Sequence, residues 1–143
     1  MKKYLFTTVL ASSLFTSLLF AQSNIVIPKA VKAAFAQKYP RVKGVKWEKE
    51  KGNYEANWGG KSGESNSALF APSGQFIETE KAIPVKQLPA SAIDYLKSHY
   101  KSAPIKEAAL VTDSKGKVTY EAEVNHKDMV FNEHGFFLKT EKE

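Results

Sequence analysis

Alternation of apolar and polar residues is the main pattern of the chain from residue 45 onward. Tyr54, Ala56 and Trp58 occupy every second position of one stretch. Glu55 and Asn57 lie between them. A period of two is typical of a strand with one buried face. The same pattern, bounded by turn residues, predicts strands at 45–50, 53–58, 67–71, 75–80, 118–124, 128–132 and 136–141.

Two shorter segments have helical periodicity instead. Apolar residues recur at helical spacing after Pro28 and again after Pro89, both of which suit the first position of a helix. The helices are expected to end before Pro40 and Pro104, since the residue before a proline disfavours the helical conformation. The apolar positions are Val31, Ala34, Phe35 and Tyr39 in the first segment, and Ala92, Ile93, Leu96 and Tyr100 in the second.

The two helices belong to an internal repeat with an offset of about 61 residues. Ile27-Pro28 aligns with Leu88-Pro89, Phe70 with Phe131, and Gly74 with Gly135. We therefore expect an α+β protein of two tandem repeats, 22–83 and 84–143, each one helix followed by a four-stranded antiparallel sheet. The repeats are expected to share a core or to pack side by side, with one sheet face left to solvent or to a partner.

The segment 1–21 has the layout of a secretory signal peptide. Lys2 and Lys3 precede an uncharged, apolar run, and Ala21 is the expected cleavage site. A retained N-terminal anchor is the alternative. The prediction is a periplasmic or secreted, soluble protein that does not span the membrane after cleavage. Because the chain has no cysteine, it is not expected to be a lipoprotein, and disulfide scaffolds and thiolate metal sites are excluded.

Charge changes the picture little at this stage. The formal net charge of +6 includes the two lysines of the leader, which leaves an excess of four over the mature chain. Acids and bases are interleaved, as in the mixed run 46–51, and this pattern is typical of a solvated surface. Nucleic acid is therefore not expected as a partner.

Several motifs resemble a known family. The string Phe35-Ala36-Gln37-Lys38-Tyr39-Pro40, followed by Val45-Lys46-Trp47-Glu48, is similar to the opening of the beta-lactamase-inhibitor-like, PepSY-like family. Tyr54-Glu55-Ala56, the hairpin 70–74 and Leu88-Pro89 extend the resemblance over the mature chain. The second repeat departs from the motif, because Lys101 replaces the proline and Ala108 or Ala109 stands near the place of the tryptophan.

The resemblance implies a small secreted or periplasmic protein that binds or inhibits without catalysis. The related beta-lactamase inhibitor grips its target with a concave, aromatic-lined sheet. The candidate binding residues are therefore aromatic, since such side chains are enriched at binding hot spots. Trp58 is the preferred exposed anchor, whereas Trp47 is expected in the core. The full set of sheet-face candidates is Trp58, Tyr54, Phe76, Tyr120 and Phe137.

Catalytic or metal chemistry is the alternative. His126, Asp128 and His134 lie across one predicted hairpin, which could serve a metal-binding protein or hydrolase, although their spacing matches no common ligand pattern. The carboxylate pairs Glu48/Glu50 and Glu121/Glu123 are expected on a solvated face among lysines. The prediction is therefore a noncatalytic module without a cofactor, with an unknown protein, peptide or cell-envelope ligand as partner.

Overall fold

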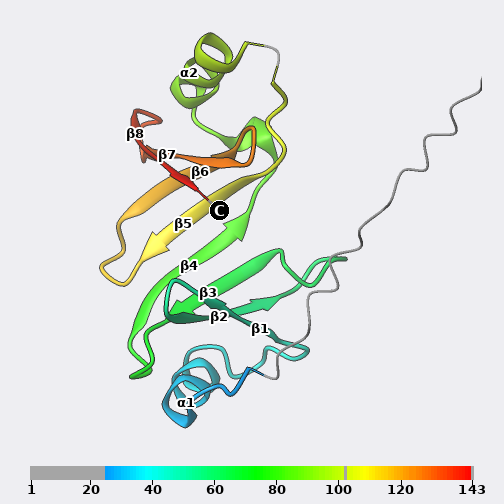
Figure 1. Ribbon diagram of the computed structural model, residues 1–143, viewed down its shortest axis with the longest axis vertical. Coiled ribbons are helices and arrows are strands. Elements are labelled where there is room, and N and C mark those ends of the chain that lie inside the picture. The colour runs from blue at the N-terminus through cyan, green and yellow to red at the C-terminus, as the bar shows by residue number, and fades with distance from the viewer. Residues whose placement is uncertain (1–24, 102, 143) are drawn as a thin grey trace, which may run out of the picture.

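The computed structural model describes residues 25–101 and 103–142. The predicted signal peptide, 1–21, lies outside the described residues. Each repeat contains one α-helix followed by four strands, as the repeat predicts, although the alternation did not identify the strand at 108–113 (Figure 1). The first repeat holds α1 (Lys29–Lys38), β1 (Lys46–Glu50), β2 (Asn53–Trp58), β3 (Asn66–Phe70) and β4 (Phe76–Ala82). The second holds α2 (Ala90–Tyr100), β5 (Ala108–Asp113), β6 (Val118–Glu123), β7 (Lys127–Asn132) and β8 (Phe137–Lys142).

The eight strands form one antiparallel sheet in sequence order, β1 to β8. The expectation of a separate four-stranded sheet in each repeat is therefore wrong. The two halves join because the free edge of β4 pairs with β5, with Glu80 opposite Val111. This pairing satisfies backbone groups that two separate sheets would leave unpaired at an edge. A short 3₁₀ helix, Val85–Gln87, lies between β4 and α2.

Each helix covers the same face of its own half of the sheet. The side chains of Val31 and Phe35 on α1 pack on Ala56, Ala68 and Phe70. In the second half, α2 packs on a cluster that includes Ala122, Met129 and Phe131. The two clusters have no buried residue in common, so the repeats share a sheet but not a core. Figure 1 shows the helices at opposite ends of the molecule with the strands between them.

Both helices begin directly after a proline. Pro28 and Pro89 have φ near −55° and are the N-cap residues, one position earlier than the sequence predicts. Each proline has an extended ψ, near 143°, and the helical turn starts at the next residue. A proline at this place costs no hydrogen bond, since the first N–H groups of a helix have no intrahelical partner.

Two turn glycines fix how closely the sheet approaches the helices. Gly74, in the β3–β4 turn, has a φ of +88°, and a Cβ there would lie 2.7 Å from the Ala30 carbonyl oxygen of α1. Gly135, in the equivalent β7–β8 turn, has a φ of +82° and similarly abuts Pro89 at the start of α2. The repeat therefore conserves a contact as well as a turn, because only glycine allows both the positive φ and the close approach.

Candidate functional site

The face of the sheet turned away from the helices carries mainly carboxylates. Trp47 and Ala56 are paired on the helix side, so the neighbouring pair, Glu48 and Glu55, points to the other side. The same alternation continues to the last strand, where Asp128 lies opposite Glu141. Other acidic side chains of this face are Glu50, Glu78, Glu80, Glu121 and Glu123.

Several of these carboxylates lie directly opposite one another. Like charges at opposed positions of neighbouring strands destabilise a sheet. The opposed pairs are Glu48 with Glu55, Glu78 with Asp113, Glu123 with Asp128, and Asp128 with Glu141. The arrangement therefore works against folding stability.

The sheet curves strongly around this face. Seven steps of about 4.8 Å would hold β1 and β8 roughly 34 Å apart in a flat sheet. Instead, Lys51 of the β1–β2 turn donates a hydrogen bond to Glu141 of β8, with 3.3 Å between Nζ and Oε2. No lysine side chain spans the flat-sheet distance. The carboxylates consequently line the inside of the curve, and the helices cover its outside.

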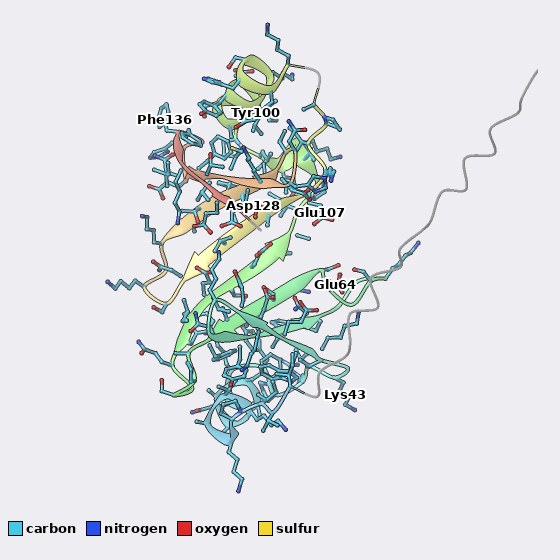
Figure 2. All side chains as sticks on the ribbon, viewed as in Figure 1. Lys43, Glu64, Tyr100, Glu107, Asp128 and Phe136 are labelled. Carbon is cyan, nitrogen blue, oxygen red and sulfur yellow. The ribbon has the colours of Figure 1, made fainter. Side chains whose placement is uncertain are left out.

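The inside of the curve is an acidic cleft with a volume of about 660 Å³. A second hollow of about 360 Å³ is continuous with it, since Glu64, Glu107 and Asp128 line both. Figure 2 shows these three residues in the middle of the molecule, between the helix-covered ends. We define the acidic cleft by its carboxylates, which are Glu48, Glu50, Glu55, Glu64, Glu78, Glu80, Glu107, Glu121, Asp128 and Glu141. These are ten of the fifteen acidic residues of a chain whose formal net charge is +6.

Glu80 and Glu121 lie at the floor of the cleft, on β4 and β6. Burial, reinforced by Glu121 and Glu55, raises the pKa of Glu80 to about 8. Burial, with Asp128 and Glu141 nearby, raises the pKa of Glu121 to about 7. Among the described residues, neither carboxyl forms an ion pair. Both therefore take up protons near neutral pH, because burial and the neighbouring carboxylates disfavour their charged forms.

Cations are found at the margins of the cleft instead. Lys139 and Lys51 donate hydrogen bonds to Glu141 and lower the pKa of its carboxyl. Lys51 is also 3.5 Å from Glu50, and both contacts raise the pKa of its ammonium group. Lys106 pairs with Glu123 at 3.2 Å beside the smaller hollow. Lys49 borders the cleft, but its ammonium group lies over the Tyr54 ring, 5.6 Å from the centroid, on the helix side.

The aromatic residues singled out from the sequence lie on the helix-covered face. Trp58 was expected to be exposed, but it is half-buried and packs on Phe35 and Tyr39 of the first repeat, at centroid distances of 5.4 and 4.8 Å. Tyr54 and Phe76 pack on the same cluster. Tyr120 packs on the second cluster, and Phe137 stacks on Tyr95 with 36% of its surface exposed. Trp47 lies under α1, as expected.

The three metal candidates do not converge. His126 lies before β7, 3.7 Å from Glu123, whereas His134 follows β7 and lies 3.5 Å from Glu133. Asp128 points into the cleft between them. In the described part of the chain, no three His, Asp or Glu side chains form a group suited to a metal ion.

The cleft is the feature that sequence reasoning missed. The alternation did place Glu48, Glu50 and Glu121 on polar strand faces. The lysines between the acids in sequence suggested a mixed, solvated surface, yet Lys49 alternates onto the opposite side of β1. Separating the two faces strand by strand would have shown acids gathering on one of them. The curvature that turns this face into a cleft has no local signal.

Comparison with known proteins supports the fold. The chain is similar to a "putative periplasmic" protein from Bacteroides eggerthii, with a TM-score of 0.68 and 16% identity over 82% of this chain and 89% of the other. A DUF2874 family protein from Bacteroides ovatus gives 0.65 and 22%, with 81% and 87% covered. A BLIP-like protein from Bacteroides fragilis gives 0.61 and 19%, with 82% and 87% covered.

No curated protein is significantly similar to the chain. In residues 25–101 and 103–142, no helix is both long and apolar enough to cross a membrane. Residues 20–62 and 57–139 match the family described as "putative beta-lactamase-inhibitor-like, PepSY-like", so the motifs of the first repeat and the pattern of the second lead to the same assignment. The chain belongs to this beta-lactamase-inhibitor-like, PepSY-like family.

Proposed function

We propose that the protein is an exported, noncatalytic binding module that holds a positively charged segment of a protein or peptide partner in the acidic cleft. The observation that carries the proposal is the gathering of ten carboxylates in the acidic cleft, eight of them on strands of one curved sheet and two, Glu64 and Glu107, in loops beside it. A partner bearing lysine or arginine would relieve the repulsion between opposed carboxylates such as Glu48 and Glu55. The likeness to periplasmic proteins and the predicted signal peptide support a place in the cell envelope.

The shape of the cleft favours a polypeptide over a compact ligand. Its volume of about 660 Å³ lies within the range of small-molecule pockets, but its walls come from seven of the eight strands and it carries charge along its whole length. A chain segment with several cationic side chains matches that distribution. Enzyme inhibition would follow where the bound segment borders a catalytic site of the partner.

Among the aromatic candidates, Phe137 stands as a second contact in this proposal. Phe137 is the candidate with the best access, and its neighbours Phe136 and Leu138 are 62% and 47% exposed. Phe136 directly precedes the edge strand β8 and Phe137 and Leu138 begin it, so a bound segment that leaves the cleft around this edge could reach them. The tryptophan and tyrosine candidates would contribute through their packing under the helices.

The test is binding of fluorescent oligolysine and oligoglutamate peptides, measured by anisotropy at physiological salt. We expect oligolysine alone to bind, and to bind about tenfold more weakly when Glu48→Gln and Glu55→Gln are combined. The matched control combines Glu133→Gln with Asp94→Asn, which removes the same charge from exposed positions outside the cleft and should leave affinity unchanged.

Two results would count against the proposal. Equal binding of both peptides would show that charge does not select the ligand. Equal weakening of oligolysine binding by the two double variants would show that the peptide does not bind in the cleft. Ca²⁺ or Zn²⁺ is titrated in parallel. A rise in melting temperature with either ion, together with failure to bind oligolysine, would replace a cationic polypeptide by a metal ion as the ligand.

A further inference from the structure

Lys51 brings a cation of the chain itself into the acidic cleft, where Lys139 also pairs with Glu141. Lys51 follows β1, and its ammonium group lies 3.5 Å from Glu50 and 3.3 Å from Glu141. Glu50 ends the first strand of the sheet, and Glu141 belongs to the last. A single side chain therefore bridges the two ends of the curved sheet across the mouth of the cleft.

The backbone at Lys51 is unusual for a lysine. Lys51 and Gly52 form the two-residue β1–β2 turn, and both have positive φ, +47° and +89°. Such turns favour asparagine, aspartate or glycine at the first position, because other side chains are strained there. The Lys51 side chain thus stands at a position where the turn alone would select a different residue.

We infer that Lys51 is an internal stand-in for a partner's lysine, and that a bound cationic segment displaces it from Glu50 and Glu141. This inference rests on the proposed function and names the position at which the partner's ammonium group binds. The bridge is suited to displacement because its cation is largely exposed, with 63% of the Lys51 side chain accessible, although Glu50 and Glu141 are half-buried. Exposed ion pairs of this kind contribute little to stability, so a ligand can replace the contact at small cost.

The direct test is carbodiimide cross-linking, which joins an ammonium group to an adjacent carboxylate, followed by peptide mass spectrometry. The free protein should give a Lys51–Glu141 cross-link. Saturating oligolysine should reduce that product and give new cross-links from the peptide to Glu50 or Glu141. A Lys51–Glu141 product that persists unchanged while oligolysine is bound would overturn the inference.

Affinity provides an independent measurement. Lys51→Gln should strengthen oligolysine binding by about two- to fivefold, because it removes one of the two internal cations that pair with Glu141. Lys51→Arg keeps the cation and should bind as the natural protein does. The charge-matched control is Lys49→Gln, whose ammonium group lies over Tyr54 on the other side of the sheet and should change affinity by less than about 1.5-fold.

The two proposals fail in different ways. If neither the natural protein nor Lys51→Gln binds oligolysine, the proposed function is wrong. If both bind and the gains from Lys51→Gln and Lys49→Gln are equal, only the inference about Lys51 is wrong, since removal of any nearby positive charge would then explain the effect.

Discussion

The two faces of the sheet are built from alternate residues of the same strands, yet they have opposite effects on the stability of the fold. On the helix side, Ala56, Phe70 and Phe131 are fully buried, and two separate apolar clusters hold the helices. On the other side, carboxylates lie opposite carboxylates around an open cleft. Burial on the first face stabilises the fold, whereas repulsion on the second reduces stability.

This difference separates the face that stabilises the fold from the face to which binding is proposed. A sheet with one packed face is free to carry an unfavourable charge pattern on the other, as long as burial exceeds the cost. Under the proposed function, the acidic face is a cation-binding site carried by a scaffold whose stability comes from the opposite face. Four experiments test this division, from the largest expected effect to the smallest.

Adjacent residues of β3 separate the two faces most clearly. Phe70→Ala should lower the free energy of unfolding by about 3–5 kcal/mol, because it removes a fully buried ring from the cluster under α1. Leu69→Ala, one residue earlier and on the cleft side, should cost about 1 kcal/mol. Urea denaturation of both variants measures the difference. Equal losses would mean that the cleft face stabilises the fold as much as the helix face.

The pH dependence of stability reports the charge on the cleft floor. The pKa values of Glu80 and Glu121 are raised to about 8 and 7 in the folded protein, above their ordinary value of 4.5. Between about pH 5 and pH 8 the folded state therefore holds protons that the unfolded chain has released. The free energy of unfolding should fall as pH rises through this window, by a few kcal/mol.

Combining Glu80→Gln with Glu121→Gln should flatten this slope, since the amides do not titrate. Asp113 is a built-in contrast, because backbone N–H groups of Lys117 and Lys115 lower the pKa of its carboxyl and move its contribution to more acidic pH. Thermal melts in buffers across the window provide the measurement. Stability that rises with pH over the same range would contradict the placement of both carboxyls.

The turn glycines test how closely the packed face is fitted to the helices. Gly74→Ala should cost about 1–3 kcal/mol, because it combines a strained positive φ with a clash against the Ala30 carbonyl of α1. Gly116→Ala is the matched control, since Gly116 has a similar φ of +82° and open space around its Cβ position. The difference between the two melting temperatures isolates the contact with the helix. Identical shifts in melting temperature would mean that glycine is needed at position 74 only for its positive φ, and not for the close approach to α1.

The smallest effect concerns a single like-charge pair. Glu48→Gln removes one charge from the pair with Glu55 and should raise the free energy of unfolding by about 0.2–1 kcal/mol at pH 7. The gain should shrink at high salt, where exposed charges are screened. Chemical denaturation at two ionic strengths checks both statements. A destabilised variant would mean that Glu48 makes a favourable contact in the fold.

Much of the fold follows from the periodicity of the chain. The helices after Pro28 and Pro89, the Lys51-Gly52 turn and the equivalent hairpins of both repeats depend on contacts between residues close in sequence. Local signals also identify which residues share a strand face, and in this way the sequence separates Ala56 from Glu55. The exposure of the aromatic candidates could not be predicted as easily. The burial of Trp58 depends on Phe35 of α1 and on Tyr39 at the end of that helix, and neither is close to Trp58 in sequence.

The sequence by itself determined the repeated unit, its helix and strands, and the two kinds of residue on alternate strand positions. Only the tertiary structure decided that the repeats share one sheet, that the aromatic face is the covered one, and that the acidic face is the inside of a curve. The physical reason is distance. The β4–β5 pairing and the Lys51–Glu141 bridge join residues that are far apart in the chain. The carboxylates of different strands form one cleft only because the curvature of the sheet brings them close together.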